Sequence, residues 1–299
     1  MKTPYLSFDT IVTHNGSAHL DDMLGVSVAI SYANRYLVNT NPSVIRLAEV
    51  KIPLQDQHVL VLDKGAVYNI DNLNFDYHQD ANLDCAFILF MDAIGLKTSL
   101  YEAFPWARSV NHNDIGGMAG VAKAFSFPGD QPTLNALGII FSNPVAEAFL
   151  NMFSTCEIIR PGDFMHAILK TIGDYILDGC LAITERVDLL TKNVKVYTTV
   201  YGIVIADMLG LPADGTNPGN GFASFLSKNH PGVSVDLIIA HCPRNIGCIR
   251  VMRYNESYDL RKWASVHPVQ FCHATGFVMT LLPGSPVPDM AELSRMCRP

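Results

Sequence analysis

Apolar and polar positions alternate in blocks along the first half of the chain. Short apolar runs predict three strands: Ile11–His14, Val44–Ala48 and Val59–Asp63. A helical pattern begins at Asp21 and Asp22, acids that the helix dipole favours in a first turn, and reaches about Tyr36. A second helical pattern covers Asp84–Ile94 and ends at Gly95. Strands that alternate with helices are typical of an α/β fold with a mainly parallel sheet.

The pattern changes in the second half of the chain. A long helix is expected after Asp163, a residue type that favours the N-cap position, and it runs to about Arg186. Beyond it, apolar stretches predict three strands: Val194–Ala206, Val233–His241 and Ile246–Arg253. We therefore expect an α/β domain over residues 1–160, a connecting helix over 161–191 and a smaller α/β domain over 192–299.

Composition favours a folded protein in a reducing compartment. The chain has 299 residues, of which 49% are hydrophobic, enough for a sizeable core. No apolar run reaches the roughly 18 residues of a membrane span, so we predict no membrane association and a cytoplasmic location. The seven cysteines are dispersed without a C-x-x-C pair, which favours free thiols over a disulfide framework or a cysteine-rich zinc site.

Charge is distributed unevenly along the chain. Residues 1–191 hold 11 Lys and Arg against 21 Asp and Glu, a net of −10, whereas residues 192–299 hold 10 against 7, a net of +3. The negative charge of the first part favours binding of cations, and the positive charge of the second part favours binding of phosphate. This balance argues against a strong duplex-DNA binder, but it allows a nuclease that acts on single-stranded ends.

Side chains that can bind metals stand where the predicted elements break: His14, His19, Asp21, Asp63, Asp76, His78 and Asp114. Because the carboxyl ends of parallel strands meet at one edge of a sheet, we expect several of these groups to converge. Crowded carboxylates repel one another unless a cation lies between them. Oxygen and imidazole donors suit Mn²⁺, Mg²⁺ or Co²⁺, and one or two such ions can activate water and stabilise a phosphoryl transition state.

Five segments match, in order, the motifs of a known family. Thr13–Asp22 read THNGSAHLDD where that family has THNGxFHxDE, and Leu62–Tyr68 read LDKGAVY where it has VDVGGVY. Phe75–Gln79 read FDYHQ for FDHHQ, Val110–Gly116 read VNHNDIG for IDxxDNG, and Phe271–Phe277 read FCHATGF for FxHASGF. The chain thus resembles the DHH phosphoesterase superfamily, and most closely its Myg-type (melanocyte-proliferating-gene) family of metal-dependent 3′–5′ exoribonucleases.

The resemblance implies a DHH-type N-terminal domain and a substrate-binding C-terminal domain, with the site in the cleft between them. It implies five metal ligands: His14, His19, Asp21, Asp63 and Asp114. Asp76 would be a bridging or orienting carboxylate, and His78 would face the scissile phosphate or the attacking water. The expected substrate-binding residues are His273, Thr275 and Gly276, joined by the cationic Lys64 and Arg250.

At three positions the chain departs from the family pattern in a way that leaves the expected metal site with less need of bound cations. Tyr77 replaces a histidine that is a metal ligand in the superfamily, Asn111 replaces an aspartate, and Lys64 replaces a small residue. In an extended segment over Ser109–Asp114, His112 and Asp114 would point to the same side. We therefore predict that His112 joins the catalytic residues and supplies the imidazole that is missing at position 77.

These observations predict a metal-dependent phosphodiester hydrolase. The resemblance favours a 3′–5′ exonuclease that shortens single-stranded RNA or short oligonucleotides, releases nucleoside monophosphates and stacks a base on Phe271 or Phe277. One alternative is a small-molecule phosphatase acting on pyrophosphate, a dinucleotide or a cyclic dinucleotide. Another is a non-catalytic nucleotide or RNA binder with a degenerate metal site. The expected partner is single-stranded nucleic acid or a nucleotide. A homodimer is also compatible with the sequence.

Overall fold

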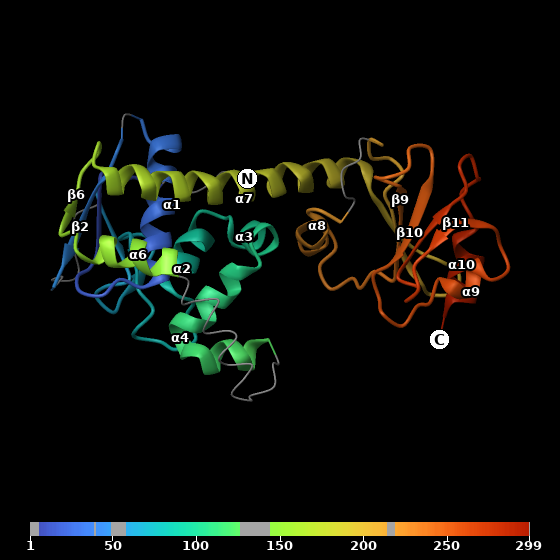
Figure 1. Ribbon diagram of the computed structural model, residues 1–299, viewed down its shortest axis with the longest axis horizontal. Coiled ribbons are helices and arrows are strands. Elements are labelled where there is room, and N and C mark those ends of the chain that lie inside the picture. Colours follow the sequence, from blue (N-terminus) through green and yellow to red (C-terminus); the bar gives the residue numbers. More distant parts are fainter. Residues whose placement is uncertain (1–5, 39, 49–57, 126–143, 214–218, 299) are drawn as a thin grey trace. The chain divides into compact units, whose positions relative to one another are not determined.

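The computed structural model describes residues 6–38, 40–48, 58–125, 144–213 and 219–298. The chain divides into two compact units, Met1–Leu181 and Ala182–Pro299, each built on a six-stranded sheet (Figure 1). The boundary falls inside the long helix α7, Phe164–Asn193. This helix occupies the region in which a connecting helix is predicted, and it begins one residue after Asp163.

The sheet of the first unit has the strand order β4-β5-β3-β1-β2-β6. Its strands are β1 (Thr10–His14), β2 (Ser43–Leu47), β3 (Val59–Leu62), β4 (Tyr68–Asn69), β5 (Asn74–Phe75) and β6 (Ile158–Ile159). The four inner strands β5, β3, β1 and β2 run parallel, and β4 and β6 pair antiparallel at the two edges. The structure therefore has the mainly parallel sheet that the alternating pattern predicts.

Helix α1 (Leu20–Tyr36) lies at the centre of the first unit. Its residues from Asp21 to Ala33 are all buried, as expected for a helix that is apolar on every side. It contacts β1, β3 and the helices α2 (Ala86–Ala93), α4 (Trp106–Ala124) and α6 (Pro144–Ser154), and α3 (Lys97–Ala103) joins α2 to α4. Since β1 ends at His14, the start of α1 lies near the carboxyl edge of the sheet.

The segment Ser109–Asp114 is helical, so the predicted strand or loop is wrong. It belongs to α4, which is interrupted only later by Gly117 with φ 59° and ψ −165°. Its polar run suggests a loop, but Ala107, Val110 and Asn111 are buried at helical spacing and pack this face into the unit. The extended geometry that placed His112 beside Asp114 is therefore absent from this segment.

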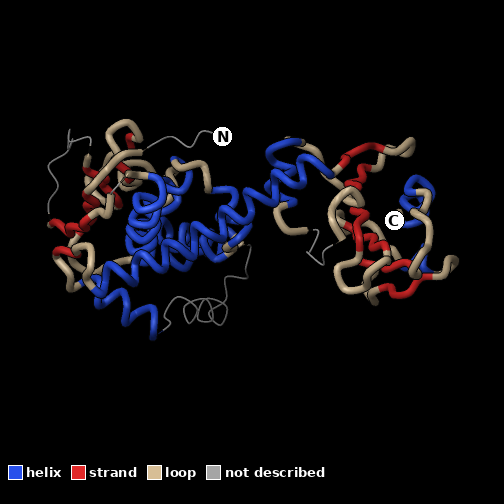
Figure 2. The backbone as a smooth tube through the Cα atoms, turned by 90° about the horizontal axis from the view of Figure 1, so that it is seen from above, coloured by secondary structure: helices blue, strands red, loops and turns tan. Residues whose placement is uncertain are grey.

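The second unit has the strand order β11-β12-β10-β9-β8-β7 (strands red in Figure 2). Its strands are β7 (Lys195–Thr198), β8 (Val204–Asp207), β9 (Leu237–His241), β10 (Ile249–Arg253), β11 (Val269–Cys272) and β12 (Val278–Leu281). Strands β8 and β9 are parallel and α8 (Phe222–Asn229) lies between them in the chain, whereas the other neighbouring strands are antiparallel. The short helices α9 (Arg261–Ala264) and α10 (Met290–Cys297) complete the unit.

One predicted strand of the second unit is in fact two. The segment Val194–Ala206 contains β7, a reversal at Gly202 with φ 74°, and β8. Glycine permits this left-handed turn, and its position inside an apolar stretch is the signal for the break. All seven cysteines are thiols outside disulfide bonds, as the sequence predicts. Within the described ranges, no helix combines the length and the apolar character of a membrane span.

A close backbone contact joins α1 to α7 inside the first unit. A Cβ atom added at Gly173 would lie 1.9 Å from the carbonyl oxygen of Ser27 and 2.6 Å from the hydroxyl oxygen of Ser31. The Ser31 hydroxyl donates a hydrogen bond to the carbonyl oxygen of Lys170 at 2.9 Å. The absence of a side chain at Gly173 therefore lets α7 lie directly on the central helix.

Gly173→Ala is expected to destabilise the protein by about 1–3 kcal/mol, because the added methyl group forces the two backbones apart. Gly116→Ala is the matched control, since a Cβ at Gly116 meets no atom within 4 Å. Alanine also has the higher helix propensity, so this control should be neutral or slightly stabilising. Urea unfolding followed by circular dichroism measures both variants. Equal stability of the two would contradict the close contact.

Candidate metal centre

Three parallel strands bring candidate metal donors to one edge of the first sheet. Strand β1 ends at His14, Asp63 directly follows β3, and Asp76 directly follows β5. These three strands are neighbours in the sheet, so their carboxyl ends lie side by side. Asp63 has a φ of 52°, a left-handed conformation that is uncommon for a residue with a side chain. Backbone strain of this kind is often found at functional sites.

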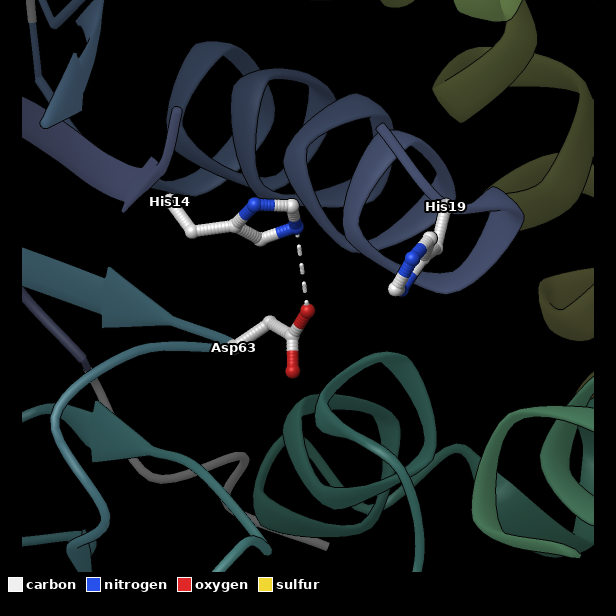
Figure 3. Close-up of side chains that lie close together, drawn as sticks. All are labelled: His14, His19 and Asp63. Atoms are coloured by element: carbon white, nitrogen blue, oxygen red, sulfur yellow. Dashed lines mark ion pairs between the residues drawn. The ribbon is translucent and has the colours of Figure 1, made fainter. Parts of the chain in front are cut away.

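Two imidazoles and a carboxylate form the first group, which we call the imidazole subsite: His14, His19 and Asp63. One ligand atom from each lies within 4.8 Å of the others. Figure 3 shows the His14 and Asp63 side chains pointing toward each other, while His19 faces the same space from the start of α1. The Nε2 atom of His14 lies 3.4 Å from Asp63 Oδ2, and the ring centroids of the two histidines are 5.5 Å apart.

In both histidines of the imidazole subsite one ring nitrogen faces carboxylates: His14 Nε2 lies 2.9 Å from Asp22 Oδ2, and His19 Nδ1 lies 3.8 Å from Asp114 Oδ1. The Nδ1 atom of His14 lies 2.7 Å from the carbonyl oxygen of Asn15, and a histidine that donates one N–H to a carbonyl presents its other nitrogen as a ligand. His19 occupies the N-cap position of α1 but makes no side-chain capping hydrogen bond. The mixed nitrogen and oxygen donors suit a divalent transition metal.

The second group, the carboxylate subsite, consists of His19, Asp21 and Asp114. Asp21 is 1% exposed, and neither of its carboxylate oxygens has a hydrogen-bond partner among the described residues. Burial, reinforced by the charges of Asp63 and Asp114, raises the pKa of Asp21 well above its usual value. A buried carboxylate without a partner is unfavourable, and a bound cation removes that cost. The donors therefore fit a metal ion.

The third group contains Asp63, Asp76 and His78. Asp76 is 1% exposed and tightly held: its Oδ2 accepts a hydrogen bond from the Ala66 N–H at 2.6 Å, and its Oδ1 accepts one from the His78 N–H at 3.1 Å. The same Oδ1 lies 2.6 Å from His78 Nδ1. This geometry suits the orienting role predicted for Asp76, because it fixes the direction of the His78 ring.

A pocket of about 630 Å³ opens above these groups. Its lining includes His14, His19, Asp63, Lys64, Asp76 and His78. Six of the residues predicted for the site thus share one cavity. Asp21 and Asp114 line a second pocket of about 300 Å³, which also includes His19.

One ion pair beside the imidazole subsite is not predicted from the sequence. Asp22, predicted only as an acid in the first helical turn, is fully buried, and its Oδ2 lies 2.9 Å from His14 Nε2 and 3.8 Å from Arg46 Nη2. Arg46 is itself 4% exposed and donates to the carbonyl oxygens of Gly16 and Phe153. The position of Arg46 inside the apolar strand β2 is the sequence signal that could have indicated a buried acidic partner for this arginine.

Two residues of the fourth motif on α4, Asn111 and His112, lie outside the three donor groups. Asn111 accepts a hydrogen bond from the Cys85 N–H and donates one to Asp84, both at 2.7 Å, so it braces the start of α2. The His112 ring packs edge-on against Phe125, with centroids 6.0 Å apart. Among the described residues, none of the donor groups includes His112. Its catalytic role stays a prediction whose geometric premise is wrong.

The predicted substrate-binding residues of the second unit lie on β10 and on the β11–β12 turn. His273 Nδ1 lies 3.0 Å from the Thr275 hydroxyl oxygen and accepts a hydrogen bond from the Thr275 N–H at 3.2 Å. Gly276 has a φ of 69°, and a Cβ there would lie 2.0 Å from Asp259 Oδ1. Glycine is therefore required to complete this turn.

A row of side chains crosses the same sheet. Arg250 on β10 stands opposite Thr280 on β12, which stands opposite Phe271 on β11, and residues in such register point to one face. Phe271 is 50% exposed and Phe277 is 39% exposed. The ring centroid of His273 lies 6.4 Å from that of Phe271 and 4.5 Å from that of Phe277. Burial lowers the pKa of Arg250, whose Nε has no hydrogen-bond partner among the described residues.

Comparison with known proteins gives a match to a protein family. The model of the MYG1 exonuclease family, described as an uncharacterised protein family (UPF0160), matches residues 10–85, the segment that contains His14, Asp63 and His78. A solved DHH-domain structure from a member of the S1p family of ribosomal proteins superposes with a TM-score of 0.32 and 11% identity, covering 91% of this chain and 82% of that one. A score this low carries no conclusion. No curated protein matches the chain.

Without metal, the protein should become less stable as pH rises from about 5 to 8. Burial and the charges of Asp114 and Asp22 raise the pKa of Asp63 to about 7, whereas an unfolded aspartate titrates near 3.9. In this window the folded state keeps a proton that the unfolded state has lost, so each rise in pH favours unfolding. The raised pKa of His14, caused chiefly by its hydrogen bond with Asp22, acts in the same direction.

Thermal melts in EDTA and in Mn²⁺ measure this effect. Added Mn²⁺ should reverse the trend, because the ion binds the deprotonated donors and binds them better at higher pH. Asp63→Asn should flatten the EDTA curve and weaken the response to Mn²⁺. A metal-free Tm that rises between pH 5 and pH 8 would contradict the crowding of carboxyls described above.

Proposed function

We propose that this protein is a metal-dependent phosphodiester hydrolase, and specifically a 3′–5′ exonuclease that releases nucleoside monophosphates from single-stranded RNA or short oligonucleotides. The observation that carries the proposal is the convergence of three overlapping donor groups, with unpartnered buried carboxylates, at the carboxyl edge of a parallel sheet. The UPF0160 match covers the first three of the four segments that supply these donors. The donor groups and the family match together favour a metal-dependent nuclease over a non-catalytic binding module.

The metal ligands proposed are His14, His19, Asp21, Asp63 and Asp114, the members of the imidazole and carboxylate subsites. Their mixture of imidazole and carboxylate suits Mn²⁺, with Mg²⁺ and Co²⁺ as the other candidates, and it has room for one or two ions. A bound ion would supply Lewis-acid stabilisation of the phosphoryl oxygens and a more acidic water.

His78 is the proposed catalytic residue of the chain itself. Its Nδ1 is directed at Asp76, which leaves Nε2 for the pocket, and its side chain is 56% exposed there. An imidazole held in this way can position the attacking water or give a proton to the leaving oxygen. Lys64 lines the same pocket and is the proposed contact for a phosphate oxygen.

The second unit is proposed to bind the 3′ end of the strand. Phe271 and Phe277 offer exposed rings on which bases can stack, and stacking of this kind does not depend on base identity. His273, Thr275 and Arg250 would provide donors for the terminal sugar or a phosphate. The net charge of +3 over residues 192–299 favours such a role.

A second candidate is a phosphatase that acts on small phosphoesters. The specific observation in its favour is the strongly acidic first part of the chain, with a net charge of −10 over residues 1–191, which does not favour a long polyanion. Pyrophosphate, a dinucleotide or a cyclic dinucleotide presents fewer charges and fits a pocket of about 630 Å³.

The experiment incubates the purified chain and Mn²⁺ with 5′-labelled single-stranded RNA, DNA, a dinucleotide, a cyclic dinucleotide and pyrophosphate. We expect RNA to shorten stepwise from its 3′ end. His78→Ala should lower kcat by about 10²–10⁴-fold while Mn²⁺ content stays unchanged, since the residue acts on the proton and not on the metal.

His112→Ala is the matched control, a histidine of the same unit that lies outside the donor groups. It should keep both metal content and turnover, and a loss of either would restore the role predicted for it from the sequence. Turnover of pyrophosphate or a cyclic dinucleotide without shortening of RNA would favour the small-molecule phosphatase. Bound Mn²⁺ without turnover of any substrate would identify a non-catalytic binder.

A further inference from the structure

We infer that Asn111 is a positioning residue for Asp114: its amide ties helix α4 to the start of α2, and this tie keeps the Asp114 carboxylate beside the donors at the start of α1. The inference rests on the proposed metal-dependent function and adds a residue that acts on the centre without contacting an ion. It follows from the hydrogen bonds of Asn111 and from the place of Asp114 on α4.

The carboxylate subsite is assembled from two helices. His19 and Asp21 lie at the start of α1, whereas Asp114 lies on α4, with its Oδ1 atom 3.8 Å from His19 Nδ1. Along α4, all of which the structure describes, no residue between Asn111 and Val121 is buried, and the helix is interrupted shortly after Asp114. Asp114 therefore stands at the end of the packed part of α4, and its position depends on the anchors that precede it.

Asn111 is the buried residue of α4 nearest to Asp114, and it lies about one turn before it. Its side chain is buried, and both ends of its amide are used. The Oδ1 atom accepts a hydrogen bond from the N–H of Cys85, the N-cap residue of α2, and the Nδ2 atom donates one to Asp84 Oδ1, each at 2.7 Å. Two directional bonds fix how α4 lies against α2, whereas apolar contacts have no preferred direction.

The carboxylate that Asn111 contacts is itself held in place. The Oδ2 atom of Asp84 lies 2.5 Å from Lys97 Nζ, which is also 3.8 Å from Asp92 Oδ2. One lysine thus already serves two carboxylates, and a third carboxylate at position 111 would repel Asp84 at the distance of the present hydrogen bond. The cluster therefore requires an amide at this position, and it accounts for Asn111 where the family pattern has an aspartate.

Helix α2 in turn packs on α1, which completes the link between the two parts of the subsite. A Cβ atom added at Gly25 of α1 would lie 3.6 Å from the Cα atom of Phe87 on α2, so little side-chain bulk separates the two helices. Helix α2 thus contacts α1 through close packing and α4 through the Asn111 amide. The influence of Asn111 on the centre runs through the placement of these helices.

The test measures the Mn²⁺ affinity of the full chain by isothermal titration calorimetry, on protein stripped with EDTA. Asn111→Leu keeps a similar side-chain volume and removes both hydrogen bonds, so Asp114 loses its nearest anchor. The dissociation constant for Mn²⁺ should rise by about 10–100-fold, the range found when a partner that orients a metal ligand is removed. Circular dichroism in EDTA shows whether each variant is folded.

Asn34→Leu is the matched control. The Asn34 amide also donates two hydrogen bonds in the same unit, but it lies near the end of α1, far along the helix from His19 and Asp21. The same chemical change there should leave the Mn²⁺ affinity unchanged. Should Asn111→Leu fail to fold, Asn111→Ser repeats the measurement, since the smaller side chain leaves room for a water molecule at the Cys85 N–H.

Two further variants separate positioning from a general loss of stability. Asp84→Asn together with Asn111→Asp exchanges the amide and the carboxylate, keeps the net charge and allows the same hydrogen bonds, so it should restore the wild-type affinity to within about threefold. In an Asp114→Asn background, Asn111→Leu should weaken Mn²⁺ binding further by about twofold or less, because the two residues act through one ligand.

The remaining outcomes overturn the inference. An unchanged Mn²⁺ affinity in the folded Asn111→Leu variant would do so and leave the proposed hydrolase intact. Equal losses of affinity with and without the Asp114 carboxylate, or an exchange variant as weak as Asn111→Leu, would assign Asn111 to the stability of the fold alone. A wild type that binds no Mn²⁺ would remove the proposed metal-dependent function as well.

Discussion

Repulsion among buried carboxylates is the constraint on which this structure depends. Asp22 faces the buried guanidinium of Arg46, and Asp76 receives backbone N–H groups, so these two charges are compensated within the fold. The carboxyl groups of Asp21 and Asp63 are buried beside Asp114, and burial together with the charge of that neighbour raises the pKa of both. Protons can relieve this repulsion at low pH, and a divalent cation can relieve it at neutral pH. The fold thus favours cation binding through its own electrostatics.

The scaffold keeps these charges together because α1 is buried and closely packed. The helix is buried along most of its length, and α7 lies against it at Gly173, where no side chain separates the backbones. Asp21 and His19 therefore approach the strand ends from a rigid element, and His14 and Asp63 meet them from neighbouring parallel strands. Donors on rigid elements hold their geometry in the absence of an ion.

Local patterns in the sequence predict the three longest strands of the first sheet and the convergence at its edge, but not the two-residue strands β4, β5 and β6. Strand periodicity and the residues that follow each strand are short-range signals, and the rule for parallel strands brings them together. The helix around His112 was missed because the polar run Asn111–Asp114 resembles a loop, and its burial depends on tertiary packing. The pairing of Asp22 with Arg46 was missed for the same reason: it joins a helix to a neighbouring strand, and register across a sheet is not visible in a single segment.

Tyr77 packs beside the proposed catalytic imidazole. Its ring stacks on His78 with centroids 4.4 Å apart, and the Nδ1 atom of His78 lies 2.6 Å from Asp76 Oδ1. The His78 ring is therefore held from two sides, by a carboxylate at its edge and by an aromatic ring at its face. Because Tyr77 also packs against the hydrophobic core of the first unit, the direction of the imidazole depends on the packing of that core. The orientation proposed for proton transfer consequently depends on apolar packing as well as on the contact with Asp76.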